Sequence, residues 1–292
     1  MRRSQGTNRP GRKPNRLQSI LIAAVLQVTL TIGAIALLMP LFWLLSTSLK
    51  ETGKEWIMPP QWIPNPPVWS NYTQALTSVP FDLFFRNTIL IAVLATLGTL
   101  WTSTMAGFAF SRLRFPGRDV LFALVLATML LPSVVTLIPT FLLFKTLGWL
   151  DTFLPLIVPY WFGGTAFSIF LSRQFFLGIP YEIDEAARVD GASSFRIYTT
   201  MMLPVSLPLL AALTIFSILH HWNDFMAPLI YLNRDEMKTL ALGLRLFQGD
   251  FGAQYNLMMA AAAVTVIPVI VLFFAAQRFF VRGIVTTGLA GR

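Results

Sequence analysis

Cysteine is absent from the 292-residue sequence, and histidine occurs only at the adjacent positions His220 and His221. The lack of cysteine excludes disulfide bonds, thiolate metal sites and cysteine nucleophiles, and it leaves the redox compartment undefined. Neighbouring residues on a regular helix point about 100° apart, so the two histidines cannot hold one metal ion between them. We therefore expect neither a metal site nor a cofactor.

Charged residues are also scarce, at 12% of the chain against 55% hydrophobic residues. A soluble domain could not bury so much apolar surface, so the chain is expected to lie in a membrane. The first apolar run is too long for a cleaved signal peptide and is expected to stay as a helix. With about 20 apolar residues to a crossing, the sequence predicts an all-α membrane protein with six transmembrane helices, near residues 18–48, 87–111, 119–144, 152–176, 204–231 and 257–281.

The distribution of basic residues predicts the orientation. With the N-terminus inside, the inner segments hold 15 of the 22 Lys and Arg residues and the outer segments hold 7. By the positive-inside rule, both termini are expected in the cytoplasm. The net charge of +9 is then an orientation signal, and no nucleic-acid partner is expected. Residues 1–17 are expected to form a disordered basic cytoplasmic arm, and residues 18–292 the six-helix transmembrane domain.

The sequence offers no site for ATP. Its nearest fragment, Gly53-Lys54, is followed by Glu55 where a phosphate-binding loop needs Ser or Thr, and it lies on the predicted outer side. We therefore expect that the chain is not an enzyme by itself. The surrounding outer loop, residues 49–86, is rich in proline and tryptophan. It either covers the helix ends at the membrane interface or contacts an external partner.

Proline and glycine interrupt several predicted spans, among them Pro132, Gly163, Gly164 and Pro268. Each proline frees a carbonyl that lipid cannot satisfy, and kinked helices around a pathway are typical of transporters, although structural bundles contain them too. Aromatic platforms and amide groups suit the recognition of a sugar. Core packing and structural hydrogen bonding are open alternatives for the five residues that could supply such a pathway: Asn87, Tyr160, Trp161, Trp222 and Asn223.

A polar segment, residues 177–203, separates the fourth and fifth predicted spans. Its pattern predicts a short helix with acidic residues in the first turns, a left-handed turn at Gly191, and a second helix that begins at Ser193 or Ser194. The expected product is a cytoplasmic helix-turn-helix. One face of the first helix would allow close docking into another protein through three apolar residues: Ile183, Ala186 and Ala187.

The same segment carries a family resemblance. It resembles the EAA motif of the permease subunits of bacterial ATP-binding-cassette importers, with Met201 where the motif usually has isoleucine. The matching positions are Glu185, Ala186, Ala187, Asp190, Gly191, Leu203 and Pro204. Five segments in order are similar to the six-helix carbohydrate permeases related to the second membrane subunit of the maltose importer: residues 108–122, 131–152, 173–193, 221–232 and 277–292.

The resemblance implies that the chain forms half of a translocation pathway in the bacterial inner membrane. Its implied partners are a homologous permease subunit, two cytoplasmic ATPase subunits, an external solute-binding protein and the surrounding lipid. The resemblance also implies that Glu185 meets a basic group of the ATPase subunit and that Gly191 shapes the turn.

The implied solute is a carbohydrate, in particular a di- or oligosaccharide. No Lys or Arg lies deep in a predicted span, which favours a neutral glycan over the glycerol phosphate that some members of the family carry. An ion-gradient-driven carrier and a membrane-embedded enzyme are the competing classes. The predicted spans contain too few mid-membrane ionisable residues to favour either.

Overall fold

The computed structural model describes residues 16–249 and 254–289, and this part of the chain is helical with no strand. The predicted arm, residues 1–17, lies outside the described residues except for Arg16 and Leu17, which begin the first helix. The longer helices are α1 (Arg16–Ser48), α3 (Phe81–Arg112), α4 (Arg118–Thr128), α5 (Ser133–Thr146), α6 (Leu154–Phe162), α7 (Ala166–Leu177), α11 (Leu207–Asn223) and α14 (Tyr255–Leu289). The shorter elements are α2 (Ser70–Thr77), α8 (Glu182–Val189), α9 (Ser194–Ile197), η1 (Tyr198–Met202), α10 (Leu203–Val205), α12 (Met226–Tyr231), η2 (Asp235–Met237) and α13 (Leu240–Leu246).

The length and apolar composition of the helices confirm the all-helical membrane fold. Two bent helix pairs raise the number of candidate spans to six if each pair counts as one crossing. Without them, four segments of the described residues are long and apolar enough to cross a bilayer: Ser19–Ser48, Phe81–Arg112, Leu154–Leu177 and Tyr255–Ala275. The structure therefore has four to six spans.

Two of the predicted spans are not continuous helices. α4 and α5 meet at 99°, where Pro132 precedes α5 and disfavours a helical conformation in the residue before it. The segment Ser194–Val205 meets α11 at 78°. The fifth predicted span continues to residue 231, but α11 ends at Asn223. There the Asp224 carboxylate accepts a hydrogen bond from the amide of Ala227 (3.2 Å), which holds the start of the separate helix α12.

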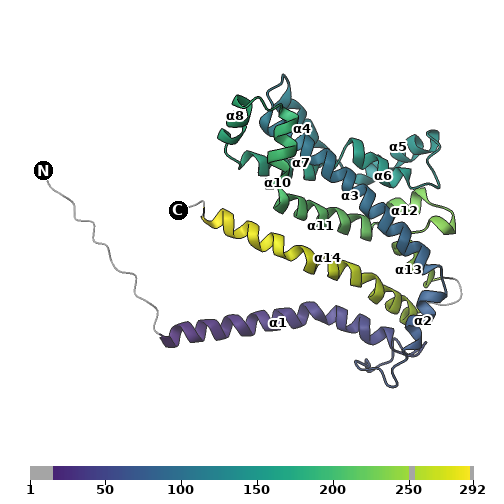
Figure 1. Cartoon of the computed structure of the whole chain (residues 1–292). Coiled ribbons are helices and arrows are strands. Elements are labelled where there is room, and N and C mark those ends of the chain that lie inside the picture. Colours follow the sequence, from purple (N-terminus) through teal and green to yellow (C-terminus); the bar gives the residue numbers. More distant parts are fainter. Residues whose placement is uncertain (1–15, 250–253, 290–292) are drawn as a thin grey trace.

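α3 runs beside α6, α7 and α11 and forms the centre of the bundle (Figure 1). Small side chains allow the close approach of α7, because a Cβ at Gly107 would lie 2.4 Å from the Cβ of Ser172. The hydroxyl of Thr96 donates to the hydroxyl of Ser217 on α11 (2.9 Å). Within lipid, small residues and interhelical hydroxyl bonds of this kind hold helices together. The remaining helices are therefore positioned against α3.

The two ends of the bundle carry different elements. In Figure 1 the start of α1, α8 and the end of α14 lie towards one side, and α2, α12 and α13 lie towards the other. The α2 end includes the outer loop, where the side chain of Asn71 donates to the carbonyl oxygens of Ser48 and Lys50 (2.9 and 2.8 Å). Trp56 and Trp69 of this loop are more than half exposed. Such exposed tryptophans suit a membrane interface, one of the two roles expected for the loop.

Candidate functional site

The polar segment between α7 and α11 forms two short helices joined by a sharp turn. α8 ends at Val189, and Gly191 adopts a φ of +80°. The amide of Gly191 donates to the carbonyl of Arg188 (3.0 Å), and the amide of Ala192 donates to that of Ala187 (2.9 Å). This pair of bonds is the Schellman arrangement, which satisfies the last carbonyls of a helix. Ser193 then begins α9, because its hydroxyl accepts a hydrogen bond from the amide of Arg196 (3.3 Å).

The faces of α8 differ from the prediction. Ile183, Ala186 and Ala187 do not form one exposed docking face, because Ala187 is buried. Ala187 packs in an apolar cluster with Phe108, Phe176, Ile179, Ile197, Tyr198 and Met202. Val189, on the opposite side of α8 from Ala187, is 87% exposed, and Ile183, one turn before Ala187, is 41% exposed. Glu185, Ala186 and Asp190 are exposed as well. Together with the exposed Glu182, the outer surface of α8 and its C-cap therefore combines apolar side chains with three carboxylates.

Arg112, the last residue of α3, lies next to α8. Its side chain is fully buried, and its Nε lies 3.6 Å from the Asp184 carboxylate on α8. Its Nη2 donates to the carbonyl oxygens of Phe176 and Ile179 (2.5 Å each). The guanidinium also stacks on the ring of Tyr181, 4.2 Å from the centroid. The sequence does not single out Arg112, because a basic residue at the inner end of a span is what the positive-inside rule predicts.

An open pocket with a volume of about 780 Å³ lies between α8, α9 and the connection that follows α3. Burial raises the pKa of Asp184 in its wall, while the positive charge of Arg112 acts in the opposite direction. Within the described part of the chain, the buried Nε and Nη1 of Arg112 and Oδ1 of Asp184 have no hydrogen-bond partner. Glu185, Arg188 and Ser193 also line this pocket. It therefore offers charges of both signs beside the exposed face of α8.

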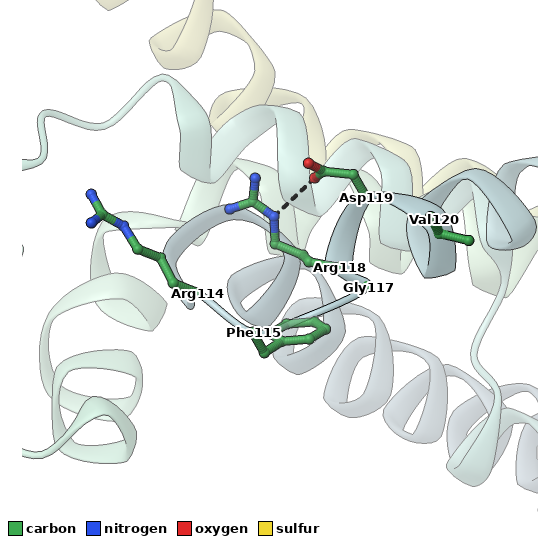
Figure 2. A pocket seen from close by; sticks show the side chains of 6 residues that line it. All are labelled: Arg114, Phe115, Gly117, Arg118, Asp119 and Val120. Atoms are coloured by element: carbon green, nitrogen blue, oxygen red, sulfur yellow. Dashed lines mark hydrogen bonds and ion pairs between the residues drawn. The ribbon is translucent and has the colours of Figure 1, made fainter.

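A second concavity, of about 480 Å³, lies next to the first and shares Arg114 and Phe115 with it. Figure 2 shows its lining, in which Arg118 reaches Asp119 (2.9 Å) and Arg114 lies apart from this pair. The Arg118–Asp119 pair belongs to adjacent residues, and the Asp119 side chain is 76% exposed. An exposed pair of this kind contributes little to stability.

The last two motif positions lie where the polar segment returns to the bundle. Leu203 is half-buried against the cluster around Ala187, and Pro204 is exposed. η1 precedes them with the wider i→i+5 pattern, in which the amide of Leu203 donates to the carbonyl of Tyr198. The 78° bend into α11 follows at Ser206. Pro204 has no amide to continue a regular helix, which accounts for an irregular segment here.

The five pathway candidates are not gathered into one of the described cavities. The amide of Asn87 donates to the carbonyls of Glu236 and Lys238 (2.8 and 3.0 Å), so it holds a loop. Tyr160 packs edge-on to His221, with ring centroids 4.5 Å apart. Trp161 donates to the carbonyl of Leu94 (3.0 Å), and Asn223 donates to that of Leu219 (2.8 Å). Trp222 lines an apolar cavity of about 180 Å³ between α3, α11 and α14. These contacts agree with the structural alternative, and a substrate role stays a prediction.

Residues 98–286 match the family described as the binding-protein-dependent transport system inner membrane component. The chain belongs to this family. The match covers more than half of the sequence and includes α8, α9 and the turn between them. The family resemblance seen in the sequence is therefore confirmed.

Individual relatives agree with this assignment. The probable ABC transporter permease protein YurM of Bacillus subtilis is 31% identical over 90% of this chain and 87% of its own length. The sn-glycerol-3-phosphate permease UgpE of Yersinia pestis is 34% identical over 88% of this chain and 94% of its own. The sulfoquinovosyl glycerol permease SmoH of Agrobacterium fabrum is 30% identical over 87% and 89%.

Solved structures extend the likeness to three dimensions. A chain from a bacterial ABC transporter that imports the acidic polysaccharide alginate superposes with a TM-score of 0.78 at 25% identity. The superposition covers 92% of this chain and 100% of the other. A second alginate transporter chain, in a complex with a pentasaccharide-bound periplasmic protein, has a TM-score of 0.66 at 19% identity and supports the fold. The protein is thus an integral inner membrane permease subunit of an ABC importer.

Proposed function

We propose that this permease couples to cytoplasmic ATPase subunits through α8 and the turn at Gly191. The outward face of α8 carries the proposal: Glu185, Ala186 and Val189 lie close together at helical spacing and are all exposed, with Val189 87% exposed. Glu185 stands on the same exposed helix, available for a charge-assisted bond to a basic group. Ala186, Asp190, Leu203 and Pro204 complete the proposed coupling element.

The assembly that follows from this role has four kinds of member. The chain pairs with a homologous permease, two ATPase subunits bind on the α8 side, and a solute-binding protein docks on the α2 side. ATP hydrolysis belongs to the ATPase subunits. In this arrangement both termini lie in the cytoplasm, as the distribution of basic residues predicts. One structural neighbour is an alginate transporter in complex with a periplasmic protein, which supports a binding-protein partner by analogy.

The solute is proposed to be a carbohydrate without strong charge. In the four long described spans, each Lys, Arg, Asp and Glu lies within five residues of a span end: Asp82, Arg86, Arg112 and Arg173. A pathway of this kind recognises hydroxyl groups better than it neutralises a buried charge. Glycerol phosphate is the second candidate, because the Yersinia pestis relative is named for it at 34% identity. Uptake of a labelled neutral oligosaccharide and of labelled glycerol 3-phosphate by reconstituted vesicles separates the two.

The coupling proposal is tested with Glu185→Ala in vesicles that contain the complete importer. Losing a hydrogen bond to a charged group costs about 1.5 to 3 kcal/mol, so the ATPase subunit should bind roughly 10- to 150-fold more weakly. Uptake should fall at limiting ATPase subunit and recover when that subunit is supplied in excess. Glu182→Ala is the matched control, because Glu182 is an exposed carboxylate on the same helix. Equal uptake and equal ATPase affinity in the Glu185 variant and the unmodified protein would refute the proposal.

A further inference from the structure

Arg112 is an unusual end for a transmembrane helix. An arginine at that position normally extends its side chain to water, along the surface of the protein. The Arg112 side chain is instead completely buried, and the Asp184 side chain next to it is 3% exposed. Removing two charges from water is costly unless each finds close partners. The placement therefore depends on the contacts that Arg112 makes.

Those contacts fasten three successive points of the chain to the end of α3. The carbonyl of Phe176 lies at the end of α7, and that of Ile179 lies in the connection to α8. Asp184 is in the first turn of α8 itself. Tyr181, which stacks on the guanidinium, also donates its hydroxyl to the carbonyl of Ser111 (2.8 Å). The planar guanidinium holds these groups in fixed directions, which a flexible ammonium group would not do.

The Arg112–Asp184 pair is distinct among the ion pairs of residues 16–249 and 254–289. The other three join residues one or three positions apart. Of these four ion pairs in the described residues, only Arg112–Asp184 connects two helices, the transmembrane helix α3 and α8. The other attachment of α8 is the apolar cluster around Ala187. Apolar contacts permit small sliding movements between packed elements. The buried ion pair, together with the hydrogen bonds from Arg112 to Phe176 and Ile179 just before α8, limits such movement.

We propose that Arg112 is the positioning residue that transmits a displacement of α8 to α3. The close contact of Gly107 with Ser172 and the Thr96–Ser217 bond then carry the movement to α7 and α11. The inference rests on the proposed function, because it takes α8 as the element that the ATPase subunits move. Coupling between two sites is reciprocal. The same link therefore carries the signal of a docked binding protein from the bundle back to α8.

The test is the double variant Arg112→Met with Asp184→Leu in the complete importer. Both charges are removed together, so no unpaired charge stays buried. The ATPase subunits should remain bound and hydrolyse ATP at the basal rate. Solute uptake and the stimulation of ATPase activity by loaded binding protein should both fall, about 5- to 150-fold, the usual range for coupling between sites. Excess ATPase subunit should not restore either.

The matched control is Arg118→Met with Asp119→Leu. This pair has the same residue types and lies in the neighbouring concavity of Figure 2, but its members are adjacent in sequence and join no two helices. Uptake and stimulation in the control should equal those of the unmodified protein. The readouts also separate the two proposals, because a docking defect at Glu185 recovers with excess ATPase subunit and a transmission defect at Arg112 does not.

The inference would be overturned if an assembled Arg112/Asp184 double variant showed the same solute uptake, and the same stimulation of ATPase activity, as the unmodified protein. Recovery with excess ATPase subunit would overturn it too, since the pair would then serve docking. If the double variant does not insert, Arg112→Lys provides the measurement, because it keeps the positive charge and loses the planar group. A partial fall in both uptake and stimulation is expected for this variant, and unmodified values for both would refute transmission through Arg112.

Discussion

Gly191 allows the backbone contribution to coupling to be measured separately from side-chain contacts. Its φ of +80° lies in the left-handed region, and a Cβ built at this position has no neighbouring atom within 4 Å. A new side chain would therefore meet no other group of the chain. The effect of substitution would come from the backbone conformation, which two hydrogen bonds to Arg188 and Ala187 hold in place.

The perturbation is a series of three substitutions, Gly191→Asn, Gly191→Ala and Gly191→Val. A left-handed conformation costs an ordinary L-residue roughly 1–2 kcal/mol, and about 1.4 kcal/mol changes an equilibrium constant tenfold. Asparagine adopts this conformation more readily than most residues, while a β-branched residue does so least readily. The equilibrium constant for forming the turn should thus be nearly unchanged for Asn, about 5- to 30-fold lower for Ala, and lowest for Val.

The assay is solute uptake by vesicles that contain the complete importer at limiting ATPase subunit, with insertion of each variant checked beforehand. Uptake should fall in the order Gly, Asn, Ala, Val. Circular dichroism should change little, since α8 has only eight residues. If Asn and Val reduce uptake equally, side-chain size at a partner contact determines the result and the argument from φ is wrong. If all three variants transport like the unmodified protein, the turn has no part in coupling.

Gly107→Leu should separate α3 from α7 and lower the yield of folded permease, because its side chain would overlap α7; a full yield of monodisperse protein would contradict this packing. Asp151→Ala should speed hydrogen exchange at the amide of Asn233, which donates to the Asp151 carboxylate. That bond lowers the pKa of Asp151 in the folded protein below the usual Asp value of about 3.9. In the unmodified protein, the Asn233 amide should therefore be protected from exchange above a pH of about 3.9, and this protection should disappear as the pH falls through the lowered pKa of Asp151. In this cysteine-free chain, a cysteine at Gly249 should react with an impermeant thiol reagent on intact cells and one at Gly117 should not; the reverse would overturn the orientation.

The parts of the site that the sequence predicts depend on neighbouring residues. Gly191 and Ser193 act through hydrogen bonds to residues no more than five positions away, so composition and spacing are sufficient to recognise them. Pro132 likewise predicts a break in the third span, because a proline restricts its own backbone and that of the preceding residue. The 99° bend at that break is not predictable in the same way. A bend angle depends on the helices packed against both halves.

The parts that the sequence does not predict depend on backbone groups far along the chain. Arg112 binds carbonyl oxygens 64 and 67 positions away. Each residue has a carbonyl, so no residue type indicates such a partner in advance. Asn87 has the appearance of a substrate-binding amide, yet it donates to carbonyls 149 and 151 positions away. For Ala187, the helical pattern placed it on one face with Ile183, but only the packing shows that the cluster around Phe176 buries it.

Asn87 and Arg112 together indicate why α3 is suited to connect the two sides of the membrane. The two residues are 25 positions apart on one continuous helix, which corresponds to about 38 Å at 1.5 Å per residue. Asn87 holds the loop at Glu236 on the predicted outer side, and Arg112 holds α8 on the other. Asn87 does this through hydrogen bonds, and Arg112 through a buried ion pair to Asp184 together with hydrogen bonds to Phe176 and Ile179, just before α8. A continuous helix attached at both ends provides the mechanical connection that the proposed coupling between an external binding protein and a cytoplasmic ATPase requires.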